Sequence, residues 1–337
     1  MRVFIVGGTG LLGSEAAEIL IQRGHKVSSI ALPTFPEGAS LPEEMDLELA
    51  NYFEMSDERL LKSMSGYDGF VFAAGIDERI DGEAPIIDLY RKYNVDSLKR
   101  LLTIAKKAGI RHVVICSSYY AYFDRIWPEK ELSRWHPYIQ SRREQEEAAL
   151  SFVSRDFDVA ILEFPSIFGA QKGRKPVWFY MIDSISNMKD ETVYPPGGTS
   201  VITRKQAGQA IAGALEKNRG GNCYPIGYYN MQWTNLLKII HKYLDCPDKK
   251  IRTIPKWVYT AGGRRLMRVQ RRNHRESGLH MVKFTELQCA DKYIDPSLGA
   301  EPLGVEPDDY DHAIGQTVKL CLRILRRKET GISMLYE

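Results

Sequence analysis

Apolar residues in the first half of the chain follow two patterns. Short runs without a polar break, such as 70–74 and 113–116, are typical of strands buried on both faces of a sheet. Elsewhere apolar residues recur every three or four positions and a glycine follows them, which predicts helices. The pattern predicts strands at 3–6, 27–32, 47–53, 70–74, 112–118 and 158–164, and helices at 14–23, 56–64, 95–105 and 138–151.

Strands that alternate with helices in this way form a parallel sheet covered on both faces. Because parallel crossovers are right-handed, we predict an α/β fold of the Rossmann type, a doubly wound parallel sheet, over residues 1–165. Beyond Pro165 we predict a smaller, mostly helical C-terminal region, made of 166–198 and 231–337, while 199–230 returns to the first domain. Its predicted helices lie at 204–217, 234–243 and 310–327.

Composition limits the class of protein. The chain has 337 residues, of which 44% are hydrophobic and 26% charged, the usual balance of a globular protein. A formal charge of +3 predicts neither nucleic acid nor membrane as a partner. The five cysteines are scattered without a CxxC pair, and no histidine has metal-ligand spacing, so we expect free thiols, a cytoplasmic location and no metal.

A glycine-rich segment joins the first predicted strand to the first helix. Gly7, Gly10 and Gly13 occupy the glycine positions of a GxxGxxG motif. One glycine permits a tight turn, one lets the backbone approach a pyrophosphate, and one lets the helix pack against the strand. Free N–H groups at the helix N-terminus can then bind the phosphates. The sequence therefore predicts a dinucleotide site formed by Gly7, Thr9, Gly10, Leu11, Leu12 and Gly13.

The identity of the dinucleotide stays open at this stage. An Asp or Glu at the end of the second strand holds the ribose hydroxyls of NAD, and a basic residue there accommodates the 2′-phosphate of NADP. Residues 28–33 contain neither type of side chain. NAD and NADP are therefore both retained as cofactors.

Candidate proton-transfer groups lie at the end of the strand 112–118 and in the helix 138–151. Tyr138 and Arg142 are four residues apart and share one helix face. A fixed cation beside a tyrosine stabilises the phenolate and lowers its pKa. Ser118 can hydrogen-bond a substrate oxygen from across the site. Such a set moves a proton to or from an alcohol while a nicotinamide carries the hydride.

The sequence resembles the extended short-chain dehydrogenase/reductases, which include the NAD-dependent epimerases and dehydratases. The segments that carry this resemblance are GGTGLLG at 7–13, FAAG at 72–75, NV at 94–95, CSSYYAY at 116–122, and YIQSR at 138–142 followed by Glu146. By this similarity Tyr138 is the acid/base, Ser118 the catalytic serine, and Asn94 supports the proton relay. Arg142 stands where the family has a lysine, and the two side chains are not interchangeable.

The resemblance also implies further site residues and an activity. The cofactor contacts that it adds are Ala73, Ala74, Gly75, Ser117, Tyr138, Arg142 and Phe164. The substrate-binding candidates are Tyr119, Tyr120 and Ser166. We expect an NAD(P)-dependent oxidoreductase or epimerase that acts at a carbinol or carbonyl carbon, with a nucleotide sugar as the first substrate candidate. The family resemblance further implies a homodimer.

A basic segment supports an alternative function. Residues 249–275 contain ten Lys or Arg and no Asp or Glu. The segment fits a phosphate-bearing substrate, an RNA or other polyanion, or a solvated helix face whose Leu266 and Val269 pack inward. Together with Arg142, Ala31 and Glu163, which stands where the family often has arginine, it motivates the alternative of a non-catalytic dinucleotide-sensing or RNA/polyanion-binding protein. A small-molecule substrate is the expected partner.

Overall fold

A seven-stranded sheet forms the centre of the first domain. The structure is a computed structural model that describes residues 1–33, 38–327 and 329–332. All its strand pairs are parallel, in the order β11-β7-β6-β4-β1-β2-β3. The strands are β1 (Arg2–Val6), β2 (Lys26–Ala31), β3 (Asp46–Leu49), β4 (Gly69–Phe72), β6 (His112–Ser118), β7 (Asp158–Phe164) and β11 (Gly221–Pro225). The predicted Rossmann-type fold is confirmed, although β3 ends earlier than the predicted strand 47–53.

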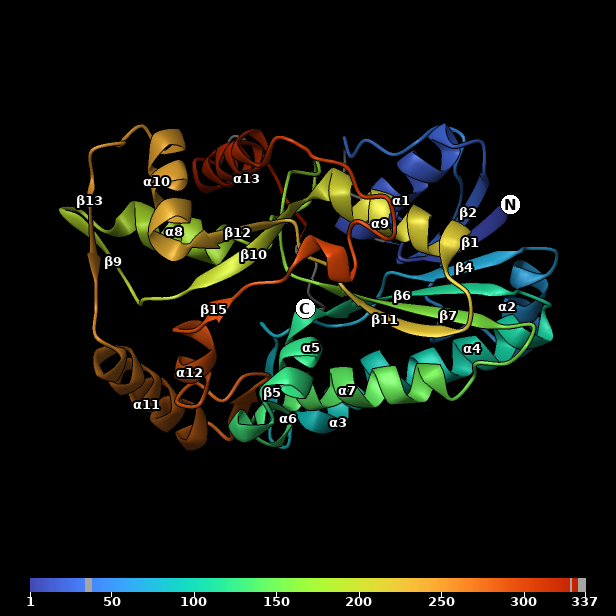
Figure 1. The fold of residues 1–337 in the computed structure, drawn as a ribbon, viewed down its shortest axis with the longest axis horizontal. Helices are drawn as coiled ribbons and strands as arrows, with labels where there is room; N and C mark the ends of the chain where they lie inside the picture. Colours follow the sequence, from blue (N-terminus) through green and yellow to red (C-terminus); the bar gives the residue numbers. More distant parts are fainter. Residues whose placement is uncertain (34–37, 328, 333–337) are drawn as a thin grey trace.

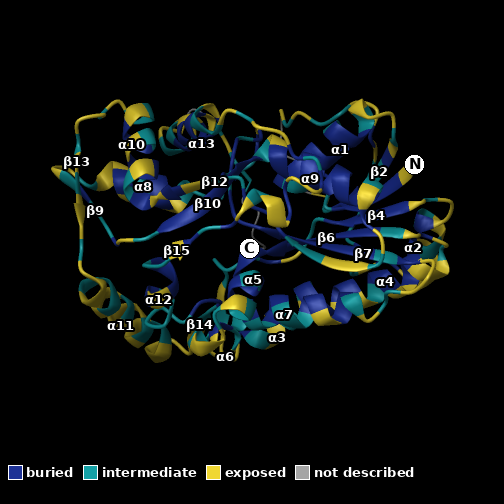
Figure 2. Cartoon of the chain, in the orientation of Figure 1, coloured by how far each residue is buried: buried dark blue, intermediate teal, exposed yellow. Residues whose placement is uncertain are grey.

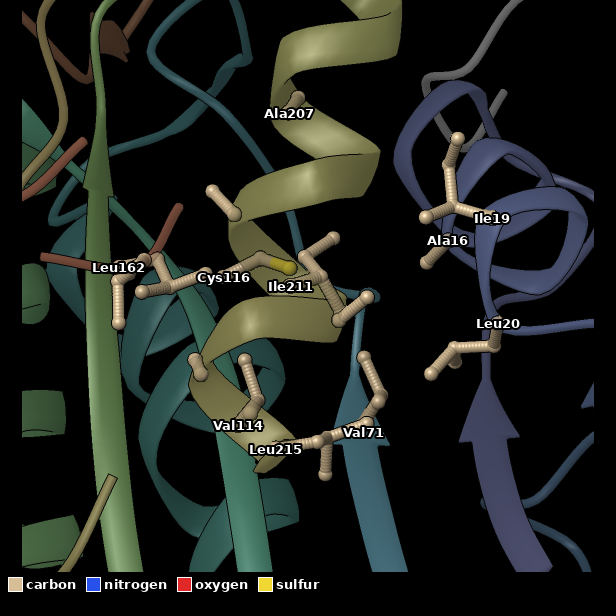
Figure 3. Packing of buried hydrophobic residues seen from close by; sticks show 14 of the residues in the cluster. Ala16, Ile19, Leu20, Val71, Val114, Cys116, Leu162, Ala207, Ile211 and Leu215 are labelled. Carbon is tan, nitrogen blue, oxygen red and sulfur yellow. The ribbon is translucent and has the colours of Figure 1, made fainter. Parts of the chain in front are cut away.

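Helices cover both faces of this sheet (Figure 1). On one face lie α1 (Leu11–Gln22) and α9 (Arg204–Lys217). On the other face lie α2 (Asp57–Met64), α4 (Ser97–Lys107) and α7 (Pro137–Leu150). Figure 3 shows Ile211 and Leu215 of α9 between the sheet residue Val114 and Leu20 of α1, and all four side chains are buried. Burying one such side chain stabilises a fold by about 1.5–3 kcal/mol.

The C-terminal region contains the predicted helices and a second sheet that the sequence pattern did not predict. Of the segment 199–230, predicted to return to the first domain, residues 204–225 pack with the main sheet, whereas its two ends belong to the second sheet. The second sheet is formed by β8 (Ser166–Phe168), β10 (Gly198–Thr203), β12 (Tyr229–Gln232) and β15 (Asp291–Lys292), and β9 (Glu191–Tyr194) pairs separately with β13 (Lys250–Thr253). The helices are α8 (Phe179–Asn187), α10 (Trp233–Tyr243), α11 (Lys256–Arg272), α12 (Phe284–Gln288) and α13 (Tyr310–Leu325). Helices α8, α10 and α13 share one buried apolar cluster with this sheet, whereas α11 lies at the edge of the molecule (Figure 1).

The strand order reverses beside β1, which places a crevice at the carboxyl ends of the strands. The chain runs from β1 to β2 and β3 on one side, and then returns to β4 on the other side. Ligands of open α/β sheets bind at such a switch point. The remaining short elements are β5 (Asp81–Glu83), β14 (Arg275–Ser277), α3 (Ile87–Tyr90), the π-helical turn η1 (Arg91–Asp96), α5 (Tyr119–Ile126), η2 (Pro128–Lys130), α6 (Leu132–Trp135) and η3 (Pro296–Leu298).

Candidate functional site

The glycine loop takes a shape that side chains would prevent. Gly7 has a φ of 98°, and a Cβ atom there would lie 2.5 Å from the carbonyl oxygen of Ala73. A Cβ atom on Gly13 would lie 2.3 Å from the carbonyl oxygen of Gly7. Helix α1 begins at Leu11, and no side chain in the described part of the chain caps its N-terminus. The first N–H groups of α1 are therefore available to an anion beside the loop.

Two further segments hold this loop in place. From β2, Ser29 Oγ accepts a hydrogen bond from the N–H of Gly8 at 3.0 Å. From the segment between β8 and α8, Arg174 donates from Nη2 to Thr9 Oγ1 at 2.8 Å and from Nε to the Thr9 carbonyl at 3.2 Å. Burial lowers the pKa of Arg174, and within the described ranges this arginine has no carboxylate partner. A positive charge without a counter-ion thus lies beside the predicted phosphate site.

Two cavities meet at the segment after β4. Ala73, Ala74 and Gly75 line both of them. One cavity extends over Gly7, Thr9 and Gly10 to the end of β2, and Arg174 lines it. The other begins at Leu11 and Leu12 and extends over the ends of β6 and β7. A dinucleotide needs a continuous groove of this kind, with the glycine loop between its two halves.

The second cavity brings together Ser118, Tyr138 and Arg142. Ser118 ends β6 and caps α5, and its Oγ accepts a hydrogen bond from the N–H of Tyr120 at 3.4 Å. Tyr138 follows Pro137 in the first turn of α7, and Arg142 lies one turn further along. The Cζ atom of Arg142 is 5.1 Å from the centre of the Tyr138 ring. The remaining lining residues that the sequence predicted are Ser117, Tyr119, Tyr120, Phe164 and Ser166.

The environment of Tyr138 both raises and lowers its pKa. Burial has the largest effect and raises the pKa to about 12. The charge of Arg142 and a hydrogen bond with Ser118 act in the opposite direction, while the Glu78 carboxylate raises the pKa further. Phenolate formation therefore depends on the cation that the sequence predicted to lie beside it.

Arg142 is a buried cation with spare hydrogen-bonding capacity. Its Nη1 donates to Gln145 Oε1 at 2.9 Å, and its Nη2 donates to the Ile76 carbonyl at 3.3 Å. Its Nε is buried and has no hydrogen-bond partner, and within residues 1–33, 38–327 and 329–332 the guanidinium forms no ion pair. Buried donors in native proteins are almost always satisfied. The unpaired Nε therefore suits a polar group of a bound cofactor, such as a ribose hydroxyl.

Asn94 does not line either cavity. It lies in the π-helical turn η1 and is fully buried. Its Oδ1 accepts from the N–H of Ile76 at 2.8 Å, and its Nδ2 donates to the Ile76 carbonyl at 3.0 Å. A Cβ atom on Gly75 would lie 2.6 Å from Asn94 Oδ1, which explains the glycine there. Asn94 thus holds the segment after β4, and its role in a proton relay stays a prediction.

The sequence analysis missed two acidic residues of the second cavity. Asp77 and Glu78 line it, and Asp77 pairs with Arg79. Burial, and then the neighbouring Asp77, raise the pKa of Glu78 to about 7, although Arg79 and Arg142 oppose this shift. Besides Tyr138, the cavity therefore holds a carboxyl group whose pKa is raised toward neutral pH. In the sequence, Glu78 could have been found as one of two adjacent acidic residues shortly after the end of a buried strand.

A buried ion network explains one departure from the family pattern. Glu163 accepts from Arg125 Nη2 at 2.7 and 2.6 Å, and Arg125 Nη1 donates to Glu146 at 2.7 Å. Burial and the neighbouring Glu146 raise the pKa of Glu163 to about 8. The carboxyl group of Glu163 at the end of β7 thus pairs with the guanidinium of Arg125 in α5.

The basic segment 249–275 supplies no cation to either cavity. None of its ten Lys or Arg side chains in the described part of the chain lines either of them. The expectation that Leu266 and Val269 pack inward is wrong, because both are about half exposed, at 46% and 49%.

Across the described ranges, every helix is too short or too polar to span a bilayer, and no three His, Cys, Asp or Glu side chains form a metal-binding group.

The doubly wound sheet, the glycine loop at its switch point and the adjoining Ser-Tyr-Arg cavity define a class of dinucleotide-binding Rossmann-fold enzymes. The family model described as "NAD dependent epimerase/dehydratase family" matches residues 3–203, and the chain belongs to this family. This membership confirms the predicted resemblance, the predicted class of enzyme and a nicotinamide dinucleotide as cofactor. A homodimer and a cytoplasmic location stay predictions.

Individual relatives are distant. A 3-beta-hydroxysteroid dehydrogenase from Mycolicibacterium neoaurum is 27% identical over 121 residues, which are 35% of this chain and 32% of that protein. The chain thus matches about a third of the length of this curated relative. The crystal structure of gox2253 has a TM-score of 0.75 at 19% identity and covers 97% of this chain and 99% of its own. MoeE5 in complex with UDP-glucose and NAD has a TM-score of 0.67 at 15% identity, over 96% and 100% of the two chains.

Proposed function

We propose that the protein is an NAD(P)-dependent oxidoreductase or epimerase that acts at a carbinol or carbonyl carbon, with Tyr138 as the acid/base. The observation that carries the proposal is the convergence of Ser118, Tyr138 and Arg142 on a cavity that adjoins the glycine loop. A nicotinamide dinucleotide supplies hydride transfer to or from the substrate carbon.

The protein's own side chains manage the proton and the orientation of the substrate. Tyr138 accepts the hydroxyl proton when an alcohol is oxidised and returns it when a carbonyl is reduced. Ser118 donates to the same substrate oxygen and holds it beside the tyrosine hydroxyl. Arg142 stabilises the phenolate by its charge, and its unpaired Nε is free to bind the nicotinamide ribose. Arg174 lies where it can bind a phosphate group of the dinucleotide.

Two substrate classes follow from the comparisons. A nucleotide sugar is one, because MoeE5 forms a complex with UDP-glucose. A hydroxylated molecule with an apolar body is the other, because the curated relative is named for 3-beta-hydroxysteroids. Arg142 is the only Lys or Arg among the described residues that line the second cavity, whereas Tyr119, Tyr120 and Trp178 supply aromatic surface. This lining favours an apolar substrate over a diphosphate in that cavity.

The test begins with the cofactor and then uses Tyr138→Phe. Titration with NADH and NADPH, followed by energy transfer from tryptophan to nicotinamide, gives the affinity for each dinucleotide. Turnover is then followed at the nicotinamide absorbance with nucleotide sugars and with hydroxysteroids. We expect Tyr138→Phe to lower kcat on the order of 100-fold or more, because a positioned acid/base contributes that much. Cofactor affinity should stay within about threefold of the wild type, because the change removes no charge.

Tyr122→Phe is the control, because Tyr122 is a nearby tyrosine of α5 that lines neither cavity. Its kcat should stay within about tenfold of the wild type. Full activity in Tyr138→Phe would exclude the proposed mechanism. Dinucleotide binding without turnover on either substrate class, together with salt-sensitive binding of a polyanion, would instead favour the non-catalytic alternative.

A further inference from the structure

Helix α11 is attached to the rest of the protein along one narrow face. No residue of its 17 is buried. Its inner face contacts α12 and the segment before it, and Thr260 Oγ1 donates to Thr285 Oγ1 of α12 at 3.3 Å. A Cβ atom on Gly263 would lie 2.8 Å from the Met281 carbonyl oxygen. Figure 1 places α11 at a corner of the molecule, away from the main sheet, and Figure 2 shows it in the colours of exposed and intermediate residues.

The charge of α11 is positive and not neutralised. The helix contains no acidic residue, and its cations are Lys256, Arg264, Arg265, Arg268, Arg271 and Arg272. Within the ranges that the structure describes, none of these six forms an ion pair or a hydrogen bond through its side chain. The neighbouring Arg252 and Arg275, by contrast, pair with Glu191 and Asp81 at 2.5 and 3.3 Å. The unpaired charge is thus concentrated on α11 itself.

Apolar side chains lie among these cations. Trp257 is 72% exposed, and Leu266 and Val269 are 46% and 49% exposed. Leu266 and Val269 are three residues apart and share one flank of the helix, whereas Trp257, nine residues before Leu266, lies on the opposite flank. The outer face of α11 lies between these two flanks. Exposed tryptophan and aliphatic groups beside a basic face are characteristic of helices that lie in the interface of an anionic bilayer.

We propose that the outer face of α11 docks on an anionic lipid bilayer. The negative surface potential of such a bilayer complements the unpaired arginines. Trp257, Leu266 and Val269 lose their contact with water only if the partner has an apolar layer beneath its charged groups, which a bilayer has and a nucleic acid lacks. The aliphatic groups therefore favour a bilayer over a nucleic acid, because an RNA surface has no apolar layer to cover them.

Docking in this way brings one cavity close to the bilayer. Tyr180 lines the cavity that holds Tyr138 and is 57% exposed, so it lies at the rim. Tyr259, on the inner flank of α11, is near enough to Tyr180 to contribute to the rise of its pKa. The rim of this cavity therefore lies beside the inner flank of α11.

The test uses the full chain and flotation with lipid vesicles. Vesicles with about 30% phosphatidylglycerol should bind the protein at low salt at least about tenfold more strongly than pure phosphatidylcholine vesicles. Binding should weaken by about tenfold or more between roughly 50 and 500 mM NaCl. The triple variant Arg264→Gln, Arg265→Gln and Arg268→Gln should lose about tenfold or more of the binding, because three surface cations are removed.

A matched triple variant tests whether vesicle binding depends on the cations of α11 or only on the net charge of the protein. Lys62→Gln, Lys99→Gln and Lys107→Gln remove three exposed cations from α2 and α4, far from α11 in Figure 1. This variant should bind vesicles within about twofold of the wild type. An equal loss in both triple variants would overturn the assignment to α11. The melting temperature of each variant checks that the fold is intact.

Tryptophan quenching tests the apolar part of the proposal. Brominated lipids should quench the fluorescence of the wild-type protein, and Trp257→Phe should abolish this quenching while most of the binding remains. Quenching that persists in Trp257→Phe would overturn the proposed orientation. Binding of poly(U) without binding of anionic vesicles would assign α11 to a nucleic acid and overturn the membrane proposal.

Discussion

Replacing Arg142 by methionine should stabilise the free protein and weaken its binding of the cofactor. Arg142 is 6% exposed and forms no ion pair within the described residues. Burying a cation without a carboxylate costs several kcal/mol. The structure offsets this cost with one short hydrogen bond, from Nη1 to Gln145 Oε1 at 2.9 Å, which is worth about 1.5–3 kcal/mol.

The other contacts of Arg142 are weaker. Its hydrogen bonds to the carbonyls of Ile76 and Cys116 are long, at 3.3 and 3.5 Å. Its position over the Tyr138 ring adds about 0.5–2 kcal/mol. Methionine fills a similar volume without a charge. We therefore expect Arg142→Met to raise the free energy of unfolding by about 1 kcal/mol and the melting temperature by about 2 °C.

Cofactor binding should change in the opposite direction. The variant lacks the unpaired Nε that suits a ribose hydroxyl, and a hydrogen bond to a charged group is worth about 1.5–3 kcal/mol. The dissociation constant for NADH should therefore rise by about 10- to 100-fold in the energy-transfer titration. Arg142→Lys is the control, because it keeps the charge and should lose less affinity than methionine. A melting temperature below that of the wild type without cofactor, or an unchanged dissociation constant, would refute the reasoning.

Two further predictions concern stability. The pKa of Glu163 is about 8 in the folded protein against an ordinary value of 4.5, so the folded chain keeps a proton that the unfolded chain releases. Stability should therefore fall as the pH rises through this window, and Glu163→Gln should flatten the fall in urea unfolding curves. At two adjacent glycines of α11, alanine should have opposite effects in the same assay. Gly262→Ala should stabilise by about 0.5–1 kcal/mol, because its Cβ meets no atom within 4 Å. Gly263→Ala should destabilise by about 1–3 kcal/mol, because its Cβ would lie 2.8 Å from the Met281 carbonyl oxygen. Equal effects of the two alanines would contradict the placement of α11.

The main sheet could be predicted because its strands are buried on both faces. The predicted ranges 112–118, 158–164 and 204–217 have the same bounds as β6, β7 and α9. The second sheet could not be predicted, because its strands have only two to six residues and their partners are distant in the sequence. Helix α5 was missed because its tyrosines directly follow a strand, where an aromatic run gives no helical period.

The residues of the candidate site also differ in whether local sequence or a distant contact determines their place. Ser118, Tyr138 and Arg142 could be predicted because each has a fixed place at the end of a strand or the start of a helix. Arg174 could not, because it is 165 residues from the Thr9 that it contacts, and no spacing in the sequence encodes that approach. Leu266 was predicted to face inward because apolar residues on a helix usually do, but the inner face of α11 is formed by smaller residues such as Gly263.

Arg142, which the sequence resemblance aligns with the family's lysine, also has a structural role. A guanidinium carries five donors in a planar fork, whereas an ammonium is a compact point charge. Arg142 uses that fork to contact Ile76 after β4, Cys116 in β6 and Gln145 in α7, so it connects the ends of two strands to one helix. A lysine can neutralise the same phenolate but has too few directed donors to make these contacts and still bind a ribose. Arg142 therefore supplies a charge beside Tyr138 and also joins the segment after β4 to β6 and α7.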